Sequence, residues 1–210
     1  MTGIVVGRRA LLGGVAVALL AGPIGGVHAA EGPIAPIERF AQTLLSIMKQ
    51  GKATPFVQRA TELTPALEGA LNLPAILRLS VGASWAGLAP AEQQRLLNVF
   101  RQYTVATFVE SFDSYNGQTV VVSPNPRPLS DNAQVVRTEI IPRDGTDPHA
   151  IDYVMRPAPD GTWKATDVLA DGTISRVAVL RSDFAAMLVR GGPAALEASL
   201  QQKTAALEGG

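Results

Sequence analysis

Side chains that could perform catalysis are few in this sequence of 210 residues, which contains no cysteine and two histidines. The absence of cysteine excludes thiol catalysis and thiolate metal sites. His28 lies in an N-terminal segment that we expect to be removed, so His149, after Pro148, is the remaining imidazole. One imidazole cannot build a catalytic triad or a two-histidine metal site, although carboxylate-only metal sites stay open. We expect no cofactor and an exposed His149 in a turn.

Carboxylates are the remaining candidates for general acid and base chemistry, which would need two of them with pKa values split by burial. The candidates are Glu110 and Asp113 on a predicted long helix, Asp152, Asp167 and Asp171 in a region of strands, and Asp183 on a later helix. Asp171 precedes Gly172 and is more simply a turn former. If the protein is an enzyme, Asp152 and Asp167 are therefore the first suspects.

Basic residues form no cluster, and the chain has 18 basic and 18 acidic side chains, which argues against a nucleic-acid partner. There is also no glycine-rich phosphate loop. Single arginines are spread over predicted strand and helix ends, at Arg137, Arg143, Arg156, Arg176 and Arg181. An arginine near a cavity mouth could pair with a lipid phosphate through two parallel hydrogen bonds, although a solvated surface arginine is the simpler interpretation of each.

Apolar side chains are the most prominent chemical feature, with several aromatic residues on one predicted helix. They fit a filled core or the wall of an apolar cavity. The candidate cavity residues are Trp85, Phe100, Tyr103, Phe108, Phe112, Tyr115, Val120, Val122, Tyr153, Trp163, Val168 and Phe184.

The N-terminus has the pattern of a secretory signal. Arg8 and Arg9 precede an apolar segment from Ala10 to Leu20, and small residues precede a predicted cleavage site after Ala29. The apolar segment is short for a membrane span. Paired arginines occur in both general secretory and twin-arginine signals, so both export routes stay open. We expect residues 1–29 to be removed and residues 30–210 to form a single exported domain.

Helices must position most of the candidate residues. Apolar spacing predicts a helix over residues 34–50, and a longer helix with an aromatic face over residues 90–114. Thr54-Pro55 and Thr64-Pro65 each predict a helix start, because threonine caps a helix and proline fits its first position. Leu73-Pro74 predicts a short helix to Leu79.

Strands follow Asn116-Gly117, and helices return after Asp171-Gly172. Four strands are predicted, over residues 119–123, 133–141, 151–156 and 163–169, with a proline-rich loop at residues 124–128. Gly191-Gly192 ends the next helix, and Pro193 opens the last one. This order predicts an α+β fold with helices packed on a curved four-stranded antiparallel meander sheet, a cone like that of NTF2, which encloses an apolar cavity.

Three stretches carry a resemblance to a known family. They are FRQYTVATFVESFDSYNGQTVVV (100–122), DYVMRPAPDGTWKATDVLADGTISRVAVLRSDFAAML (152–188) and GGPAALEASL (191–200). They contain an aromatic helix that ends in Tyr115-x-Gly117, a Trp163-Lys-x-x-Asp-Val168 strand, a turn with Gly172, and an Arg181-Ser-x-Phe184 helix. An upstream Gly82-x-x-Trp85 also fits. The chain therefore resembles the MlaC, or toluene-tolerance auxiliary, family of periplasmic lipid-binding proteins.

One departure from the family pattern concerns the ligand. Phospholipid-carrying members usually have a Glu-Gly-Val-Ser-like turn, whereas this chain has Asp171-Gly-Thr-Ile-Ser175, together with Phe112-Asp-x-Tyr115. These two motifs are more similar to those of HpnM, the branch associated with hopanoid biosynthesis. A rigid polycyclic lipid and a diacyl phospholipid need cavities of different shape, so both ligands stay open.

The resemblance implies a binding protein and not an enzyme. It implies a periplasmic shuttle that exchanges lipid with an inner-membrane ABC transporter carrying an MCE-domain subunit, and possibly an outer-membrane lipoprotein. Two other functions remain open from the residues: a small NTF2-like enzyme acting on a hydrophobic molecule, and an exported adaptor that binds no lipid.

Overall fold

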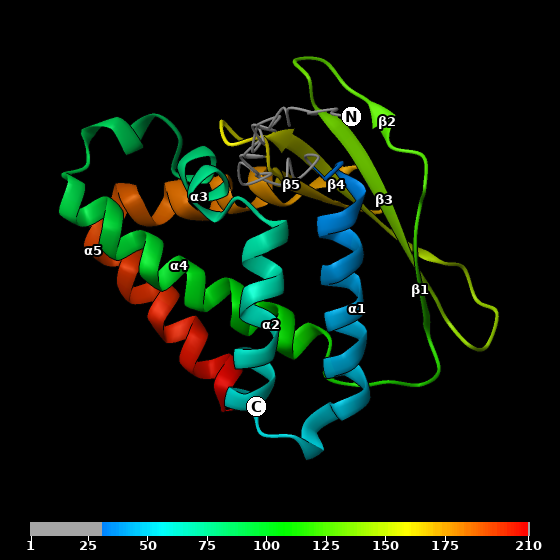
Figure 1. Cartoon of the computed structure of the whole chain (residues 1–210). Coiled ribbons are helices and arrows are strands. Elements are labelled where there is room, and N and C mark those ends of the chain that lie inside the picture. The colour runs from blue at the N-terminus through cyan, green and yellow to red at the C-terminus, as the bar shows by residue number, and fades with distance from the viewer. Residues whose placement is uncertain (1–30, 210) are drawn as a thin grey trace, which may run out of the picture.

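Helices pack against an antiparallel sheet in the computed structural model, which describes residues 31–209 (Figure 1). The predicted α+β class is confirmed. The helices are α1 (Ile34–Gln50), α2 (Phe56–Ala70), α3 (Leu73–Val81), α4 (Pro90–Ser111) and α5 (Arg176–Glu208), with 3₁₀ helices at Gly51–Ala53 and Gly82–Gly87. The strands are β1 (Thr119–Val122), β2 (Arg127–Pro128), β3 (Gln134–Ile141), β4 (His149–Pro157), β5 (Trp163–Ala170) and β6 (Ile174–Ser175). The predicted signal segment lies outside the described residues.

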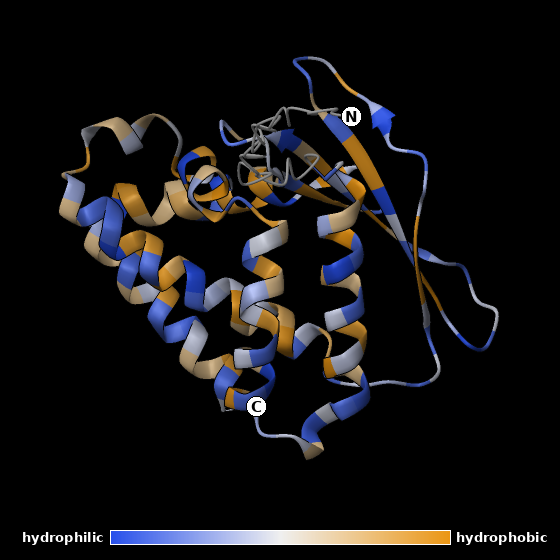
Figure 2. Ribbon diagram, viewed as in Figure 1, coloured by the Kyte–Doolittle hydropathy of each residue, from blue (hydrophilic) through white to orange (hydrophobic). Residues whose placement is uncertain are grey.

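Local signals explain where several helices begin and end. α1 buries Phe40, Leu44 and Ile47 along one side and ends before Gly51, its C-cap, whose φ of 57° suits glycine. The Asn72 side chain caps α3 by accepting a hydrogen bond from the Ala75 amide at 3.1 Å. Figure 2 shows hydrophobic and hydrophilic residues alternating along α1 and α4, the pattern of helices with one buried face.

The predicted helix start at Thr64-Pro65 is wrong, because Pro65 lies inside α2. The buried residues Leu63 and Leu67 flank Pro65 on one continuous side of this helix. Pro65 itself is exposed. This helix face is buried both before and after the proline, and its burial therefore outweighs the lost backbone hydrogen bond.

The sheet has six strands and not the predicted four. Its order is β1-β3-β4-β5-β6, all antiparallel, and the short β2 pairs with the first two residues of β3. The four predicted strands correspond to β1, β3, β4 and β5. The proline-rich segment also contributes β2, where Arg127 pairs with Val135 at an edge. His149 is exposed, as expected, but begins β4 and pairs with Ile140, so its predicted place in a turn is wrong.

A β-bulge in β5 sets which side chains face the helices. Val154 pairs with Asp167 and Met155 pairs with Ala165, so Thr166 is an extra residue on β5. The bulge lets Ala165 be fully buried while Val168 and Ala170 also face the helical side, where they line a pocket. Strict alternation from Ala165 would have turned Val168 to the opposite face.

The C-terminal helix breaks where the sequence predicts. Gly191 and Gly192 have non-helical dihedral angles inside α5, and Pro193 follows them. The segment after this break runs beside α4 (Figure 1) and buries Leu196 and Leu200. α4 is therefore held from both sides, by α5 and by α2.

Candidate functional site

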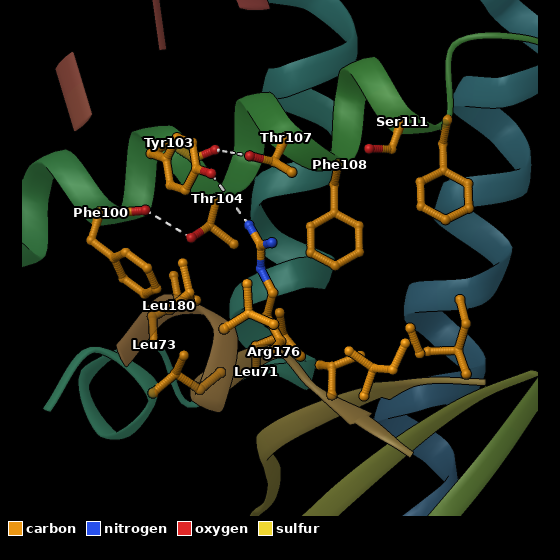
Figure 3. Close-up of a pocket in the computed structure, with 17 residues that line it drawn as sticks. Leu71, Leu73, Phe100, Tyr103, Thr104, Thr107, Phe108, Ser111, Arg176 and Leu180 are labelled. Atoms are coloured by element: carbon orange, nitrogen blue, oxygen red, sulfur yellow. Dashed lines mark hydrogen bonds between the residues drawn. The ribbon is translucent and has the colours of Figure 1, made fainter. Parts of the chain in front are cut away.

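A pocket of about 350 Å³ opens between α4, the first turns of α3 and α5, and the helical face of the sheet (Figure 3). Its wall from α4 consists of residues at helical spacing, Phe100, Tyr103, Thr104, Thr107, Phe108, Ser111 and Phe112. Leu71, Leu73 and Ile76 come from α3 and the residues before it, and Val179 and Leu180 come from α5. The lining is predominantly apolar, which is typical of sites for hydrophobic ligands.

Hydroxyl groups on the α4 wall are largely occupied by their own helix. Thr104 Oγ1 donates to the Phe100 carbonyl and Thr107 Oγ1 donates to the Tyr103 carbonyl, each at 2.8 Å (Figure 3). These donors are therefore satisfied without a ligand, and the threonines present their methyl groups as apolar surface.

The sheet supplies the facing wall. Ile151 from β4 and Val168 and Ala170 from β5 line the pocket, together with Ile174 from β6. The Asn72 amide donates to the Ala165 carbonyl at 2.8 Å, and this bond holds the segment between α2 and α3 against β5. This contact places Leu71, which follows α2, and Leu73, which begins α3, at the pocket beside the sheet.

Arg176, the first residue of α5, is the one charged side chain among the described residues that line the pocket. Its Nη2 donates to the Tyr103 hydroxyl at 3.3 Å. This hydrogen bond joins the start of α5 to α4 across the pocket (Figure 3). The two residues are far apart in the sequence, so nothing in the local pattern indicates their contact.

Five of the twelve predicted cavity residues line the pocket: Phe100, Tyr103, Phe108, Phe112 and Val168. Phe108 and Phe112 stack with ring centroids 6.0 Å apart. Contact of these five residues with a lipid stays a prediction. Thr104, Thr107 and Ser111 also line the pocket and are not among the predicted residues, although the helical period that joins Phe100 to Phe108 and Phe112 indicates this face of the helix.

The other seven predicted residues lie away from this pocket. Tyr153 and Phe184 are core residues that pack edge-on against Phe40 and Phe100, respectively. Trp85, Val122 and Trp163 are half-buried against the same core, and Val120 and Val122 border a separate groove beside α1. Tyr115 is exposed, with Lys49 Nζ 5.4 Å from its ring centroid. Periodicity identifies apolar residues but does not separate core from pocket.

The two suspected catalytic carboxylates have structural partners outside the pocket. Asp152 forms an ion pair with Arg137 and lies on the sheet face opposite Ile151 and Tyr153. Asp167 accepts hydrogen bonds from Ser175 Oγ at 2.5 Å and from the Val177 amide at 3.0 Å. Asp167 therefore fixes the start of α5, and neither carboxylate faces a ligand bound in this pocket.

Three further properties of the described residues bear on function. No group of three or more histidine and carboxylate side chains within residues 31–209 is placed to hold a metal ion. Burial raises the pKa of the Tyr153 phenol, which keeps it neutral in the core. None of the helices in this range is both long enough and apolar enough to span a membrane.

Comparison with known proteins gives the family. A family model described as MlaC protein matches residues 38–202, which is most of the chain. The chain belongs to the MlaC family. No curated protein matches it. The resemblance to MlaC is thus confirmed, whereas the assignment of this MlaC-family protein to the HpnM branch stays a prediction.

A solved structure shows the same fold. It is a phospholipid-binding protein from Ralstonia solanacearum in complex with a phospholipid, with a TM-score of 0.70 and 22% sequence identity. The match covers 84% of this MlaC-family chain and 99% of the other. At this identity the likeness establishes the fold, and the ligand of the Ralstonia protein is a property of that protein.

Proposed function

We propose that this protein is a periplasmic lipid-binding shuttle, which carries a phospholipid or a hopanoid between membranes as the soluble component of an ABC-type lipid transport system. The observation that carries the proposal is the apolar pocket between α4 and the sheet. MlaC membership and the phospholipid-bound structural neighbour support it. The family resemblance suggests the partners: an inner-membrane transporter with an MCE-domain subunit, and possibly an outer-membrane lipoprotein.

The energetics of lipid transfer explain why such a carrier needs a pocket and no catalyst. Exposing lipid chains to water opposes transfer by about 0.8 kcal/mol per methylene, so a diacyl lipid with ~30 methylenes would lose some ~24 kcal/mol without enclosure. A protein that covers the chains during transit removes most of this barrier. The headgroup can stay near the mouth, in contact with solvent.

The size of the pocket indicates how a lipid would be accommodated. Its 350 Å³ lies near the lower end of the range for ligand pockets, about 300 to 1,000 Å³. It equals the liquid volume of roughly a dozen water molecules. A diacyl lipid therefore requires the pocket to widen on loading, or leaves part of its chains at the open mouth.

The test is the lipid content of the protein purified without detergent after expression of the full chain. We expect lipid extraction and native mass spectrometry to find bound lipid in the wild type. Thr107→Trp places an indole ring in the pocket from α4, so the purified variant should contain no bound lipid. Thr61→Trp is the matched control, because Thr61 is exposed on α2 and makes the same type of hydrogen bond to its own helix. A wild-type protein that is empty and takes up no lipid from vesicles would overturn the proposal.

A further inference from the structure

Arg176 places a positive charge against an otherwise apolar pocket. Its side chain extends from the sheet side toward α4, and in the view of Figure 3 its guanidinium lies between the rings of Phe100 and Phe108. Ile174 and Val179, which border the same pocket, are 55% and 40% exposed. Arg176 is also exposed. The charge therefore lies at the mouth, where the pocket meets solvent.

Arg176 makes fewer side-chain hydrogen bonds than Arg137 and Arg181. Its one side-chain hydrogen bond within residues 31–209 goes to the neutral Tyr103 hydroxyl, and no carboxylate in that range forms an ion pair with it. By contrast, Arg181 gives two hydrogen bonds to the Leu79 carbonyl, and Arg137 gives two to Asp152. A guanidinium has five N–H donors, so most of those on Arg176 are available to a ligand.

The chemistry of the guanidinium indicates which ligand group would bind to Arg176. Its planar donors match two oxygens of a phosphate, and charge-assisted bonds of this type are about twice as strong as neutral ones. A neutral polycyclic lipid has no group that needs this charge. A phosphate at the mouth would leave the Phe100 and Phe108 sides of the pocket to the acyl chains (Figure 3).

We propose that Arg176 binds the phosphate of a lipid headgroup, and that the hydrogen bond to Tyr103 holds the guanidinium across the mouth of the pocket. The inference rests on the proposed lipid-binding function. It narrows the ligand to a phosphate-bearing lipid and makes Arg176 the residue that discriminates between headgroups. When a lipid binds, Arg176 gives up its weak hydrogen bond to Tyr103 and forms an ion pair with the lipid phosphate.

The test compares two lipids that share their acyl chains and differ in phosphate. Isothermal titration calorimetry measures binding of dioctanoyl phosphatidylglycerol and of dioctanoylglycerol to protein purified from the full chain. We expect the wild type to prefer the phosphate-bearing lipid by about 10- to 100-fold. Arg176→Gln should abolish that preference while the affinity for dioctanoylglycerol stays unchanged. Arg176→Lys should restore part of the preference, because lysine binds phosphate as a point charge.

Controls separate headgroup recognition from a structural role. Arg190→Gln removes the same charge from an exposed position of α5 that bonds only the Ala186 carbonyl of its own helix, and it should keep the wild-type preference. Loss of affinity for both lipids in Arg176→Gln, or a preference that survives this substitution, would overturn the inference.

Two outcomes distinguish the sources of failure. If the wild type binds both lipids equally, the proposed lipid-binding function stands and the role of Arg176 is wrong. If the wild type binds neither lipid, both are wrong. Inorganic phosphate alone should bind far more weakly than phosphatidylglycerol. Tight, Arg176-dependent binding of inorganic phosphate without a lipid preference would assign the site to the free anion and overturn the headgroup proposal.

Discussion

Arg137 and Asp152 form a two-point ion pair across the neighbouring strands β3 and β4. Arg137 Nε lies 2.7 Å from Oδ1 of Asp152, and Nη2 lies 2.9 Å from Oδ2. Asp152 is 1% exposed, whereas the Arg137 side chain is 49% exposed. The hydrogen bonds to Asp152, and then its charge, raise the pKa of the Arg137 guanidinium. The pair joins two strands on the face opposite the pocket, so we interpret Asp152 as structural.

Asp152→Asn should lower the free energy of unfolding by about 1 to 3 kcal/mol, less than for a fully buried pair because solvent still reaches Arg137. Urea denaturation measures this loss, and the folded fraction should keep its bound lipid. Asp183→Asn, at an exposed position of α5, is the control and should change neither quantity. Unchanged stability together with lost turnover of a hydrophobic substrate would instead support an acid or base role for Asp152.

Gly172→Ala should disturb the same ion pair. Gly172 has a φ of 70°, and a Cβ added there would lie 2.9 Å from Arg137 Nη2. We expect a loss of about 1 to 2 kcal/mol from the strained backbone and the displaced guanidinium. Gly69→Ala in α2 meets no heavy atom within 4 Å and should be neutral or slightly stabilising. Equal thermal stabilities of the two variants would contradict this account.

Deletion of Thr166 should damage the sheet far more than a substitution at the same place. Without this extra residue, either Ala165 or Val168 must turn to the opposite face. We expect loss of cooperative unfolding or of bound lipid. Thr166→Ala keeps the bulge and removes only a 3.3 Å hydrogen bond to the Val154 carbonyl, so it should cost no more than about 1 kcal/mol. A deletion variant with wild-type stability would show that the bulge does not set the register.

Pro65→Ala should raise the melting temperature, because it restores a backbone donor within α2 and removes a clash with the preceding turn. The gain should be about 1 to 3 kcal/mol, since proline in a helix interior is about 3 kcal/mol less favourable than alanine. Pro74→Ala is the matched control, because Pro74 is also exposed but lies in the first turn of α3, where it suits the helix. The two variants should therefore differ clearly in thermal unfolding, and a similar response would count against this explanation.

Local signals predicted much of the fold. The apolar spacing around Phe40 and Gly51 identified α1, Pro90 marked the start of α4, and Gly191-Gly192 marked the break in α5. These signals act within a few residues and are therefore readable from a sequence. Pro65 was misleading because the packing of Leu63 and Leu67 overrode a local rule. β2 and β6 were missed because two-residue strands have no period to detect.

The sequence by itself determined the α+β class, the MlaC resemblance and the aromatic face of α4, since each follows from residue types at fixed spacings. Only the tertiary structure decided which apolar residues line the pocket. An extra residue at Thr166 brings Ala165 and Val168 to the same side of β5, and strand alternation alone cannot show this. Likewise, Arg176 reaches Tyr103 only because α5 begins opposite α4. Contacts between distant residues depend on how the whole chain packs, and no local pattern records them.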